Sequence, residues 1–284
     1  MMRCYFVSDL HGSLHRYKAL ATLLRTSPPD ALFLGGDLFP AGLFIQQPGK
    51  GFVDFVDGYL LPLFTQLCHE LGSHYPAIYL ILGNDDPRSS EQRLLDAENL
   101  GLWHYLQQRS AIQDGWHLWG YSYIPPSPFL LKDWERYDVS GFVDVGCVSP
   151  EAGTRTVPVP PEQIRWNTIA RDLAAVEGDL SRSILLFHAP PYQSDLDRAA
   201  LDGQKIDHVP LDVHVGSIAI QRFIAARQPH ITLHGHIHES PRITGHWMQT
   251  FGKTTSFSAA HDGPQLAVIR FDPAHPETAD RVLL

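Results

Sequence analysis

The order of elements along the sequence predicts an α/β fold in which helices cover a sheet. Short apolar runs alternate with longer stretches of helical periodicity in the first third of the chain, and this alternation is typical of βαβ units. Polar residues follow each apolar run directly, as they do where strands end at a ligand site. With 284 residues, of which 44% are hydrophobic and 19% charged, the chain is long enough to bury a large core without disulfides.

Three strands and two helices are predicted in the N-terminal third. The strands span 3–8, 31–34 and 77–82, and the helices between them span 13–25 and 52–71. Each strand is a short apolar run, and each helix is longer, with apolar residues at helical spacing. Because ligands of such sheets collect at the carboxyl ends of the strands, the residues directly after each strand are the first candidates for a functional site.

The remaining two thirds of the chain continue this pattern around two inserted stretches. A β-like alternation over 111–124 is followed by a Pro- and Gly-rich stretch over 125–161, a helix over 161–176 and a buried strand over 183–187. Next come a polar stretch over 194–212, a second helix over 216–227, a short strand over 231–233 and an antiparallel tail over 242–271. No internal repeat or linker divides the chain. We therefore predict a single domain over residues 1–284 with insertions near 125–161 and 194–212.

Composition excludes several classes of protein. Cys4, Cys68 and Cys147 share no CxxC-type spacing, so they indicate thiols of a reducing compartment and neither a disulfide framework nor a zinc knot. The sequence has no secretory signal and no run of about 18 apolar residues, which predicts a cytoplasmic protein without a membrane span. Its 22 Lys and Arg against 31 Asp and Glu give a net charge of −9, which disfavours nucleic acid as a partner.

Ligand-type side chains follow five of the predicted strands. They are Asp9, His11, Asp37, Asn84, His188, His236 and His238. Each has an ordinary structural explanation when taken alone, since an Asp after two glycines is commonly a turn residue. Seven such residues just beyond buried strands would, however, all meet at one edge of one sheet. The sequence therefore predicts a metal site at that edge.

The residue types favour two adjacent divalent ions. Imidazole and carboxylate together suit Mn, Fe, Zn, Ni or Co, and no cysteine lies in the pattern. Asp37 has two carboxylate oxygens and could bridge both ions. Two ions about 3.5–4 Å apart hold a hydroxide and clamp the attacking and leaving oxygens of a phosphoryl transfer. We expect manganese as the cofactor, with iron, zinc, nickel, cobalt or magnesium as alternatives.

The ordered motifs are similar to the signature of the calcineurin-like metallophosphoesterase superfamily. They read Asp9-x-His11, Gly36-Asp37, Gly83-Asn84, His188 and Gly235-His236-x-His238. The resemblance implies a four-layer α/β/β/α sandwich of two mixed sheets flanked by helices, with a dimetal site at the carboxyl-terminal edge of the strands. It further implies that one ion is bound by Asp9, His11, Asp37 and His238, and the other by Asp37, Asn84, His188 and His236.

The sequence departs from this superfamily after two of the motifs. Many members carry a histidine directly after the Gly-Asn pair, where it protonates the leaving group or supports the transition state, and this chain has Asp85 there. Members that dephosphorylate serine and threonine in proteins extend Gly-Asp with Val-Asp-Arg-Gly, whereas this chain continues with Leu38, Phe39 and Pro40. The resemblance therefore points away from the protein phosphatases.

Asp85 leads to a hypothesis about the substrate, and we name it with Asn84 as a candidate catalytic residue. Two divalent ions, two ligand carboxylates and a bridging hydroxide sum to about +1, so an ionised Asp85 would repel a phosphomonoester dianion more than a diester. A protonated Asp85 would instead act as a general acid. Both alternatives favour phosphodiesters, although Arg88 could offset the charge. The structural alternative is that Asp85 only caps the turn before Pro87.

Arg88 and His214 are candidate substrate contacts. His214 precedes a predicted helix whose N-terminus could receive phosphate oxygens, and its structural alternative is a surface histidine. The sequence thus predicts a dimetal phosphoesterase that hydrolyses a small phosphoester through a bridging hydroxide, with a preference for diesters. The alternatives are a phosphomonoesterase or nucleotide hydrolase of the same superfamily, or a non-catalytic scaffold. Scaffold relatives typically lose ligands, whereas every ligand position is filled here; the oligomeric state stays open.

Overall fold

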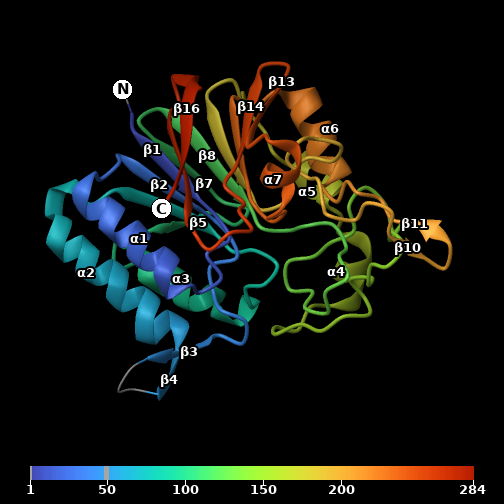
Figure 1. Cartoon of the computed structure of the whole chain (residues 1–284), viewed down its shortest axis with the longest axis horizontal. Helices are drawn as coiled ribbons and strands as arrows, with labels where there is room; N and C mark the ends of the chain where they lie inside the picture. The colour runs from blue at the N-terminus through green and yellow to red at the C-terminus, as the bar shows by residue number, and fades with distance from the viewer. Residues whose placement is uncertain (1, 48–50) are drawn as a thin grey trace.

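Two mixed six-stranded sheets stack face to face in the structure, a computed structural model that describes residues 2–47 and 51–284 (Figure 1). In the first sheet, β1, β2, β5 and β6 are parallel, while β15 runs antiparallel to β1 and β16 antiparallel to β15. Its order is β16 (His275–Leu283), β15 (Ala267–Asp272), β1 (Cys4–Val7), β2 (Ala31–Gly35), β5 (Ala77–Ile81) and β6 (His104–Tyr105).

The second sheet has four parallel strands in its middle and an antiparallel strand at each edge. Its order is β13 (Met248–Phe251), β14 (Thr254–Ser258), β12 (Ile231–His234), β9 (Ser183–Phe187), β8 (Trp116–Tyr121) and β7 (Ser110–Gln113). Each sheet therefore brings the carboxyl ends of several parallel strands to one edge, which is where an open α/β sheet places its ligands.

Helices cover the outer face of each sheet (Figure 1). The first sheet is covered by α1 (Leu14–Thr26), α2 (Leu61–Leu71) and α3 (Glu91–Glu98), and the second by α5 (Ile169–Ala174) and α6 (Ile218–Arg227). The short helices α4 (Pro161–Trp166) and α7 (Ser240–Thr244) and the 3₁₀ turns η2 (Gly72–His74) and η3 (Arg88–Ser90) lie in connections. The predicted four-layer sandwich of two mixed sheets between helices is confirmed.

The alternation of side chains along β1 shows how the layers are joined. Cys4 and Phe6 point to one side and pack in the cluster between the two sheets, whereas Tyr5 and Val7 point to the other and pack under the helices. Successive side chains of a strand face opposite sides, so a central strand with both faces covered is apolar throughout. This is why the short apolar runs of the sequence identify the central strands.

The helix expected over 52–71 begins later than predicted. Gly51–Asp54 is strand β4, which pairs with β3 (Phe44–Gln47) in a two-stranded hairpin, and a π-helical turn, η1 (Val56–Leu60), precedes α2. The Asp54 carboxylate accepts the backbone N–H groups of Val56 and Asp57 at 2.9 and 3.1 Å. It thereby satisfies donors at the start of a helix, and this sets the boundary that the apolar pattern did not show.

The helix expected over 161–176 is also interrupted. Asn167 and Thr168 are extended between α4 and α5, and the Thr168 side chain caps α5 by accepting the Arg171 N–H at 3.1 Å. In the C-terminal tail, β14 pairs in parallel with β12, so the tail is not wholly antiparallel. Neither α3 nor β16 was predicted. Both contain many polar residues, most of α3 is only partly buried and most of β16 is exposed, so the apolar pattern of each is weak.

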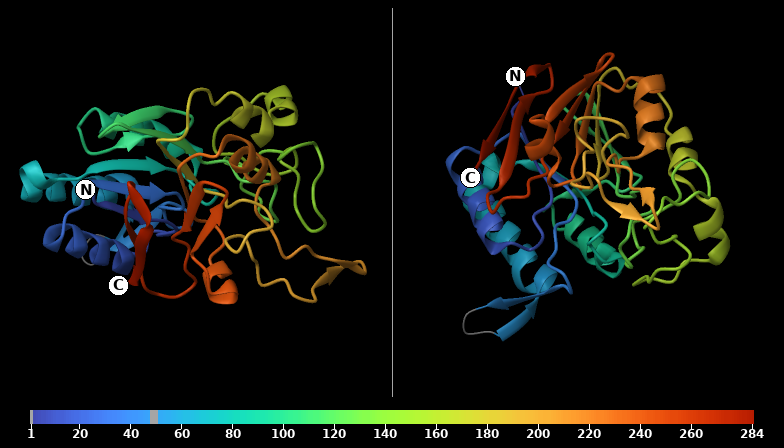
Figure 2. Two further views of the ribbon diagram at one scale, coloured as in Figure 1. Left: turned by 90° about the horizontal axis from the view of Figure 1, so that it is seen from above. Right: turned by 45° about the vertical axis from the view of Figure 1, so that its right-hand side comes forward.

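The two stretches expected as insertions surround one end of the sheets. Residues 125–161 are mostly irregular, and 194–212 contain the hairpin of β10 (Lys205–Ile206) and β11 (Val209–Pro210). Figure 2 shows this hairpin projecting from the body of the molecule. None of the helices in residues 2–47 and 51–284 combines the length and hydropathy that crossing a bilayer requires.

Candidate metal centre

The structure brings together the seven ligand-type side chains at the edge where strands of both sheets end. Asp9 and His11 follow β1, Asp37 follows β2, Asn84 follows β5, His188 follows β9, and His236 and His238 follow β12. They form two groups of donor atoms, one from Asp9, His11, Asp37 and His238 and one from Asp37, His188 and His236, with all atoms of a group within 4.8 Å of one another.

The first group contains two carboxylates and two imidazoles in direct contact. The Nε2 atoms of His11 and His238 lie 3.0 Å apart, and His238 Nε2 lies 3.4 Å from Asp9 Oδ1. Asp37 Oδ2 lies 3.9 Å from His11 Nε2. Four donor atoms from three loops therefore converge on one small volume, as the ligands of a bound cation do.

Asp37 also belongs to the second group. Its Oδ2 lies 3.3 Å from His188 Nε2, and His188 Nε2 lies 3.0 Å from the amide oxygen of Asn84. The rings of His188 and His236 lie side by side, with centroids 5.2 Å apart. One carboxylate is thus shared by two adjacent sets of donors.

The backbone around these ligands is held in a conformation that side chains rarely adopt. Asp9, His11, Asp37 and His236 all have positive φ angles of 47–73°. Such residues are uncommon outside glycine, and they cluster at functional sites because neighbouring structure must enforce them. Two hydrogen bonds between the loops contribute, from Asp9 N–H to Gly36 O at 3.0 Å and from His11 N–H to Asp37 O at 2.8 Å.

Two glycines allow the loops to approach the ligands. A Cβ on Gly36 would lie 2.7 Å from His188 Nδ1, and a Cβ on Gly83 would lie 2.3 Å from Asp37 Oδ1. Any side chain at either position would displace a ligand. His188 Nδ1 is also 2.8 Å from Gly35 O, which places the proton on Nδ1 and turns Nε2 toward Asp37.

The charges of the centre suit a cation. Burial acts to raise the pKa of Asp9, but the hydrogen bond and charge of His238 outweigh it and hold that pKa below its ordinary range. Burial also opposes a charge on His188, yet Asp37 raises the pKa of this imidazole to about 10. Burial and the charge of His188 lower the pKa of His236 to about 3, so its ring is neutral.

These shifts describe two buried carboxylates that draw a proton onto a neighbouring histidine. Within the described residues, no Lys or Arg side chain forms an ion pair with the carboxylate of Asp9 or Asp37. A divalent cation would replace the histidine proton as the positive charge, since ligands bind metals in their deprotonated form. The donor set therefore fits two divalent ions of the kind that mixed imidazole and carboxylate sites bind.

Asp86 stabilises two of the loops that carry the ligands, and it was not singled out from the sequence. Its buried carboxylate accepts the backbone N–H groups of Leu38, Phe39 and Gly83 at 2.8–3.0 Å. It thus joins the loop after β2 to the loop after β5. Burial, and then the charge of Asp37, raises the pKa of Asp86 to about 8. The sequence signal was only an acidic residue in a turn, which is too common to interpret.

Arg16 is a second support that sequence reasoning missed. Its guanidinium donates to the backbone carbonyl of Asp9, to Gly263 O at 2.6 Å and to His261 O at 3.3 Å. It therefore fixes the loop that carries Asp9 against the C-terminal part of the chain. Its position in the first turn of α1, close after the Asp9-x-His11 motif, is the signal that could have indicated it.

Asp85 lies on the open side of the centre. Its side chain is 46% exposed, with Oδ2 at 3.5 Å from His11 Nδ1. Its Oδ1 accepts from the Asn84 side-chain amide at 2.8 Å, and its own N–H donates to Asp37 Oδ1 at 2.8 Å. Asp85 is therefore in contact with three ligand-type residues without belonging to either donor group.

Arg88 and His214 belong to neither donor group, and each is paired with an acidic residue outside the centre. The Arg88 guanidinium pairs with Glu91 at 3.2 Å and sits over the ring of Trp134. His214 Nδ1 is 2.7 Å from Asp197 Oδ1. The N-terminus of α6, which the sequence suggested for phosphate oxygens, is occupied instead by the carboxylate of Asp138, which accepts the N–H groups at the start of that helix.

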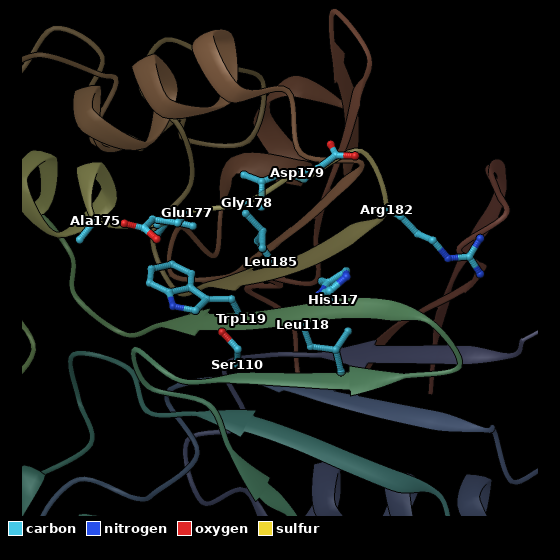
Figure 3. A pocket seen from close by; sticks show the side chains of 12 residues that line it. Ser110, His117, Leu118, Trp119, Ala175, Glu177, Gly178, Asp179, Arg182 and Leu185 are labelled. Carbon is cyan, nitrogen blue, oxygen red and sulfur yellow. The ribbon is translucent and has the colours of Figure 1, made fainter.

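A separate pocket of about 350 Å³ lies away from the ligands (Figure 3). It is bounded by His117 and Trp119 of β8 and by the connection that precedes β9, with Glu177 and Arg182 among its polar residues. This connection leads into the amino end of β9, whereas His188 follows the carboxyl end. The pocket and the ligand cluster are therefore at opposite ends of the same strand.

Comparisons with known proteins agree with this architecture. A sequence model of the calcineurin-like phosphoesterase family matches residues 2–240. No curated protein matches the chain in sequence. Among solved structures, TT1561 of Thermus thermophilus is 13% identical with a TM-score of 0.57, over 99% of this chain and 98% of that one. A dimetal phosphatase from Danio rerio is 10% identical with a TM-score of 0.51, over 94% and 92%. Likeness at these identities shows a shared fold.

Proposed function

The chain belongs to the calcineurin-like phosphoesterase family, whose members are generally phosphoric ester hydrolases, and we propose that it hydrolyses a small phosphodiester at a centre of two divalent cations. The observation that carries this proposal is the position of Asp37, whose carboxylate belongs to both groups of donor atoms. A shared carboxylate between two sets of imidazole and carboxylate donors is the arrangement that a pair of adjacent cations requires.

We assign the ligands by these groups. Asp9, His11, Asp37 and His238 would hold one ion, and Asp37, His188, His236 and the amide oxygen of Asn84 the other. When bound, the two cations supply Lewis acidity, which activates water and offsets the charge of the phosphoryl oxygens. Manganese is the ion we propose, because it accepts both imidazole and carboxylate ligands; zinc, iron, nickel, cobalt and magnesium are the competitors.

The protein contributes orientation around these ions. His188 is fixed by its hydrogen bond to Gly35 O, and the Asp9 carboxylate accepts the His236 N–H at 3.0 Å. These bonds hold ligand atoms in place before any substrate binds. Such preorganisation lowers the cost of gathering charge around the phosphoryl group in the transition state.

The proposed preference for diesters rests on Asp85. Its half-exposed carboxylate lies beside His11 on the open side of the centre. An ionised Asp85 adds a negative charge that opposes a monoester dianion more strongly than a diester monoanion. A protonated Asp85 would donate a proton to the leaving alcohol, which also helps a diester. The guanidinium of Arg88, which we expected from the sequence to be able to offset this charge, forms an ion pair with Glu91. Its positive charge is therefore partly neutralised already.

Metal-depleted protein tests the proposal directly. It should hydrolyse neither bis-p-nitrophenyl phosphate nor p-nitrophenyl phosphate, and re-supply with Mn, Ni, Zn or Mg in parallel should restore turnover of the diester most strongly with Mn. Elemental analysis should find two ions per chain. A strong preference for the monoester would contradict the diester proposal, and cation-independent turnover would contradict the whole function.

Variants of Asp85 test its part separately. Asp85→Asn removes the charge while keeping the size of the side chain. It should therefore lower the ratio of diester turnover to monoester turnover by about tenfold, which corresponds to about 1.4 kcal/mol. Asp85→His should change the ratio in the same direction. Asp57→Asn, at an exposed carboxylate paired with Arg93, is the matched control and should leave the ratio unchanged. An unchanged ratio in Asp85→Asn would remove Asp85 from the argument.

We also propose a cytoplasmic location. Cys4, Cys68 and Cys147 are all free thiols, and Cys4 is buried in the core between the sheets. Unpaired cysteines are typical of proteins from reducing compartments. Expression of a tagged chain followed by cell fractionation would test the assignment.

A further inference from the structure

We propose that the pocket of Figure 3 binds a small organic cation, whose alkylated ammonium group lies between the indole of Trp119 and the carboxylate of Glu177. The pocket has a volume of about 350 Å³, within the range of small-molecule sites. It lies at the amino end of β9, whereas His188 of the metal centre follows the carboxyl end. A ligand in this pocket would not touch the proposed phosphoesterase site, so the two assignments can fail separately.

The pocket forms where the helical cover of the second sheet ends. Along β8, the Leu118 side chain packs in the cluster between the two sheets, while Trp119 packs against the cluster on the outer face. Helix α5 ends at Ala174, and the chain continues without a helix from there to β9. The Trp119 indole therefore contacts the core but stays half-buried. A large aromatic ring that is only partly covered offers a surface that a ligand can contact.

Both walls of the pocket are held in place. The Trp119 ring stacks on the ring of Tyr121, with centroids 5.5 Å apart and an interplanar angle of 11°. On the other wall, the Arg227 guanidinium donates to the carbonyl oxygens of Val176 and Gly178 at 2.5 and 2.8 Å. A pocket that is formed before its ligand arrives loses less conformational entropy on binding.

Two carboxylates give the pocket a negative charge, and they belong to Glu177 and Asp179. Asp179 accepts hydrogen bonds from the backbone N–H and the hydroxyl of Ser181 at 2.9 and 2.7 Å. Within the described part of the chain, no side chain pairs with the Glu177 carboxylate or donates a hydrogen bond to it. Exposed carboxylates elsewhere, such as those of Glu70 and Glu151, each pair with an arginine. Glu177 is thus a free anion beside an aromatic ring.

Arg182 also lines the pocket, but its guanidinium is engaged elsewhere. Its Nε donates to Gly115 O at 2.8 Å and its Nη2 to Asp114 O at 3.3 Å, and the group lies 4.5 Å from the centre of the Trp116 ring. Figure 3 shows this side chain extending away from Trp119. The negative charge beside Trp119 is therefore not neutralised by Arg182.

An aromatic face and a free carboxylate together favour an alkylated ammonium over other ligands. The face of a tryptophan attracts a cation that lies within about 6 Å of the ring centre, and alkyl groups on the nitrogen bury apolar area against the ring. An anion would be repelled by the two carboxylates. A metal ion needs several ligand atoms around one point, and the described residues of this pocket contain no such group of His, Cys, Asp or Glu.

Selective ¹⁵N labelling of tryptophan allows binding to be measured at the pocket itself. The chain has 6 tryptophans, each with one indole N–H signal, and the signal missing from Trp119→Phe belongs to Trp119. At pH 8, where imidazole side chains carry little charge, choline should shift this signal saturably, with a Kd in the millimolar range. The uncharged isostere 3,3-dimethylbutan-1-ol, in which carbon replaces the nitrogen, should bind at least about 10-fold more weakly. Equal binding of the two compounds, or no saturable shift of the Trp119 signal, would overturn the proposal.

A matched pair of variants tests the carboxylate. Glu177→Gln keeps the size of the side chain and removes its charge, so it should weaken choline binding about threefold while leaving the isostere unaffected. Glu277→Gln is the control, because Glu277 is 70% exposed on β16 of the other sheet, and it should change the binding of neither compound. Unchanged choline binding in Glu177→Gln, or equal weakening in the control, would overturn the proposal. If choline binds as expected and the Mn-loaded protein fails to hydrolyse bis-p-nitrophenyl phosphate, only the phosphoesterase function fails.

Discussion

The metal centre and the two stretches that surround it, 125–161 and 194–212, are built in different ways. The ligands of the centre come from five strand ends, and backbone bonds between the loops, such as His11 N–H to Asp37 O, hold them in place. The surrounding stretches are held by buried polar side chains of their own. Lys132 and Glu135, for example, form a fully buried ion pair, and Asp197 closes its segment with several bonds.

This difference has a consequence for how the two regions respond to substitution. The sheets determine the geometry of the centre, so losing one ligand should weaken cation binding while the fold persists. Side chains determine the geometry of the surrounding stretches, so losing one buried polar partner there should loosen a stretch while the cations stay bound. Substitutions in each region can therefore test whether the centre and the surrounding stretches are stabilised independently.

Asp37→Asn should have the largest effect. The change removes the charge of the ligand that both donor groups share, and a metal's contribution of several kcal/mol to the transition state corresponds to a loss of about 10³-fold in kcat/KM. Elemental analysis should find fewer than two ions per chain. The far-ultraviolet circular dichroism of the variant should match that of the wild type, because the strands around it are unchanged.

Asp85→Asn provides the control for this comparison. It removes a carboxylate from the same centre that belongs to neither donor group, so two ions per chain should remain. If Asp37→Asn kept both ions and its activity, or if it failed to fold, the separation between ligand centre and supporting sheets would be wrong.

The residues of the centre were predictable because the sheets leave few choices. A buried strand reads as an apolar run, and the residue after it must lie at the carboxyl edge, so Asp37 after 31–34 and His188 after 183–187 could be placed without knowing the packing. The apolar runs alone predicted these residues at the edge of a single sheet, whereas the ligand-bearing strands belong to two sheets. The two mixed sheets were implied by the resemblance to the superfamily. Boundaries failed where a polar side chain decided them, as Asp54 does at the start of η1.

The supporting aspartates could not be predicted, because they join residues far apart in sequence through side chains of common type. Asp133 accepts the backbone N–H of Arg88 across 45 positions, and Asp138 reaches the start of α6 across about 80. No local pattern distinguishes such aspartates from those that solvate a loop. Asp86 shows the same limit within the centre itself, since its partners Leu38 and Phe39 lie in another loop.

Lys132→Met should give the second largest effect, now in the surrounding region. Lys132 Nζ contacts Glu135 at 2.5 Å and Ser127 O at 2.9 Å, and both side chains of the ion pair are fully buried. Removing one partner of a buried pair leaves the other charge uncompensated, which costs about 3–5 kcal/mol. Hydrogen exchange should show faster exchange over residues 125–161, whereas the two ions per chain should remain bound.

The double variant Lys132→Met with Glu135→Gln is the control for this prediction. It removes both charges, so it should recover most of the lost protection. Protection unchanged in the single variant would show that the stretch does not depend on this pair. Loss of cations from the single variant would show instead that the stretch and the centre are not independent.

The smallest effect concerns His234, which lies on β12 just before the ligands. Its ring stacks on Phe187, and burial lowers its pKa to about 4 from an ordinary 6.5. A histidine with a lowered pKa in the folded state takes up its proton more readily when unfolded. Its contribution to stability is therefore complete above pH 6.5 and is lost as the pH falls toward 4, by about 3 kcal/mol.

The measurement compares the metal-free wild type with metal-free His234→Asn by urea unfolding at several pH values. The variant starts from a lower stability at pH 7, because it loses the stacked ring, but it has no group to titrate at this position. The gap between the two proteins should therefore narrow by about 3 kcal/mol between pH 6.5 and 4. Metal-free protein is needed because protonation of the ligands would release cations over the same range. A stability difference that stays constant with pH would mean that the His234 ring is charged or hydrated in the folded state. This residue of β12 would then be less buried than it is in the structure.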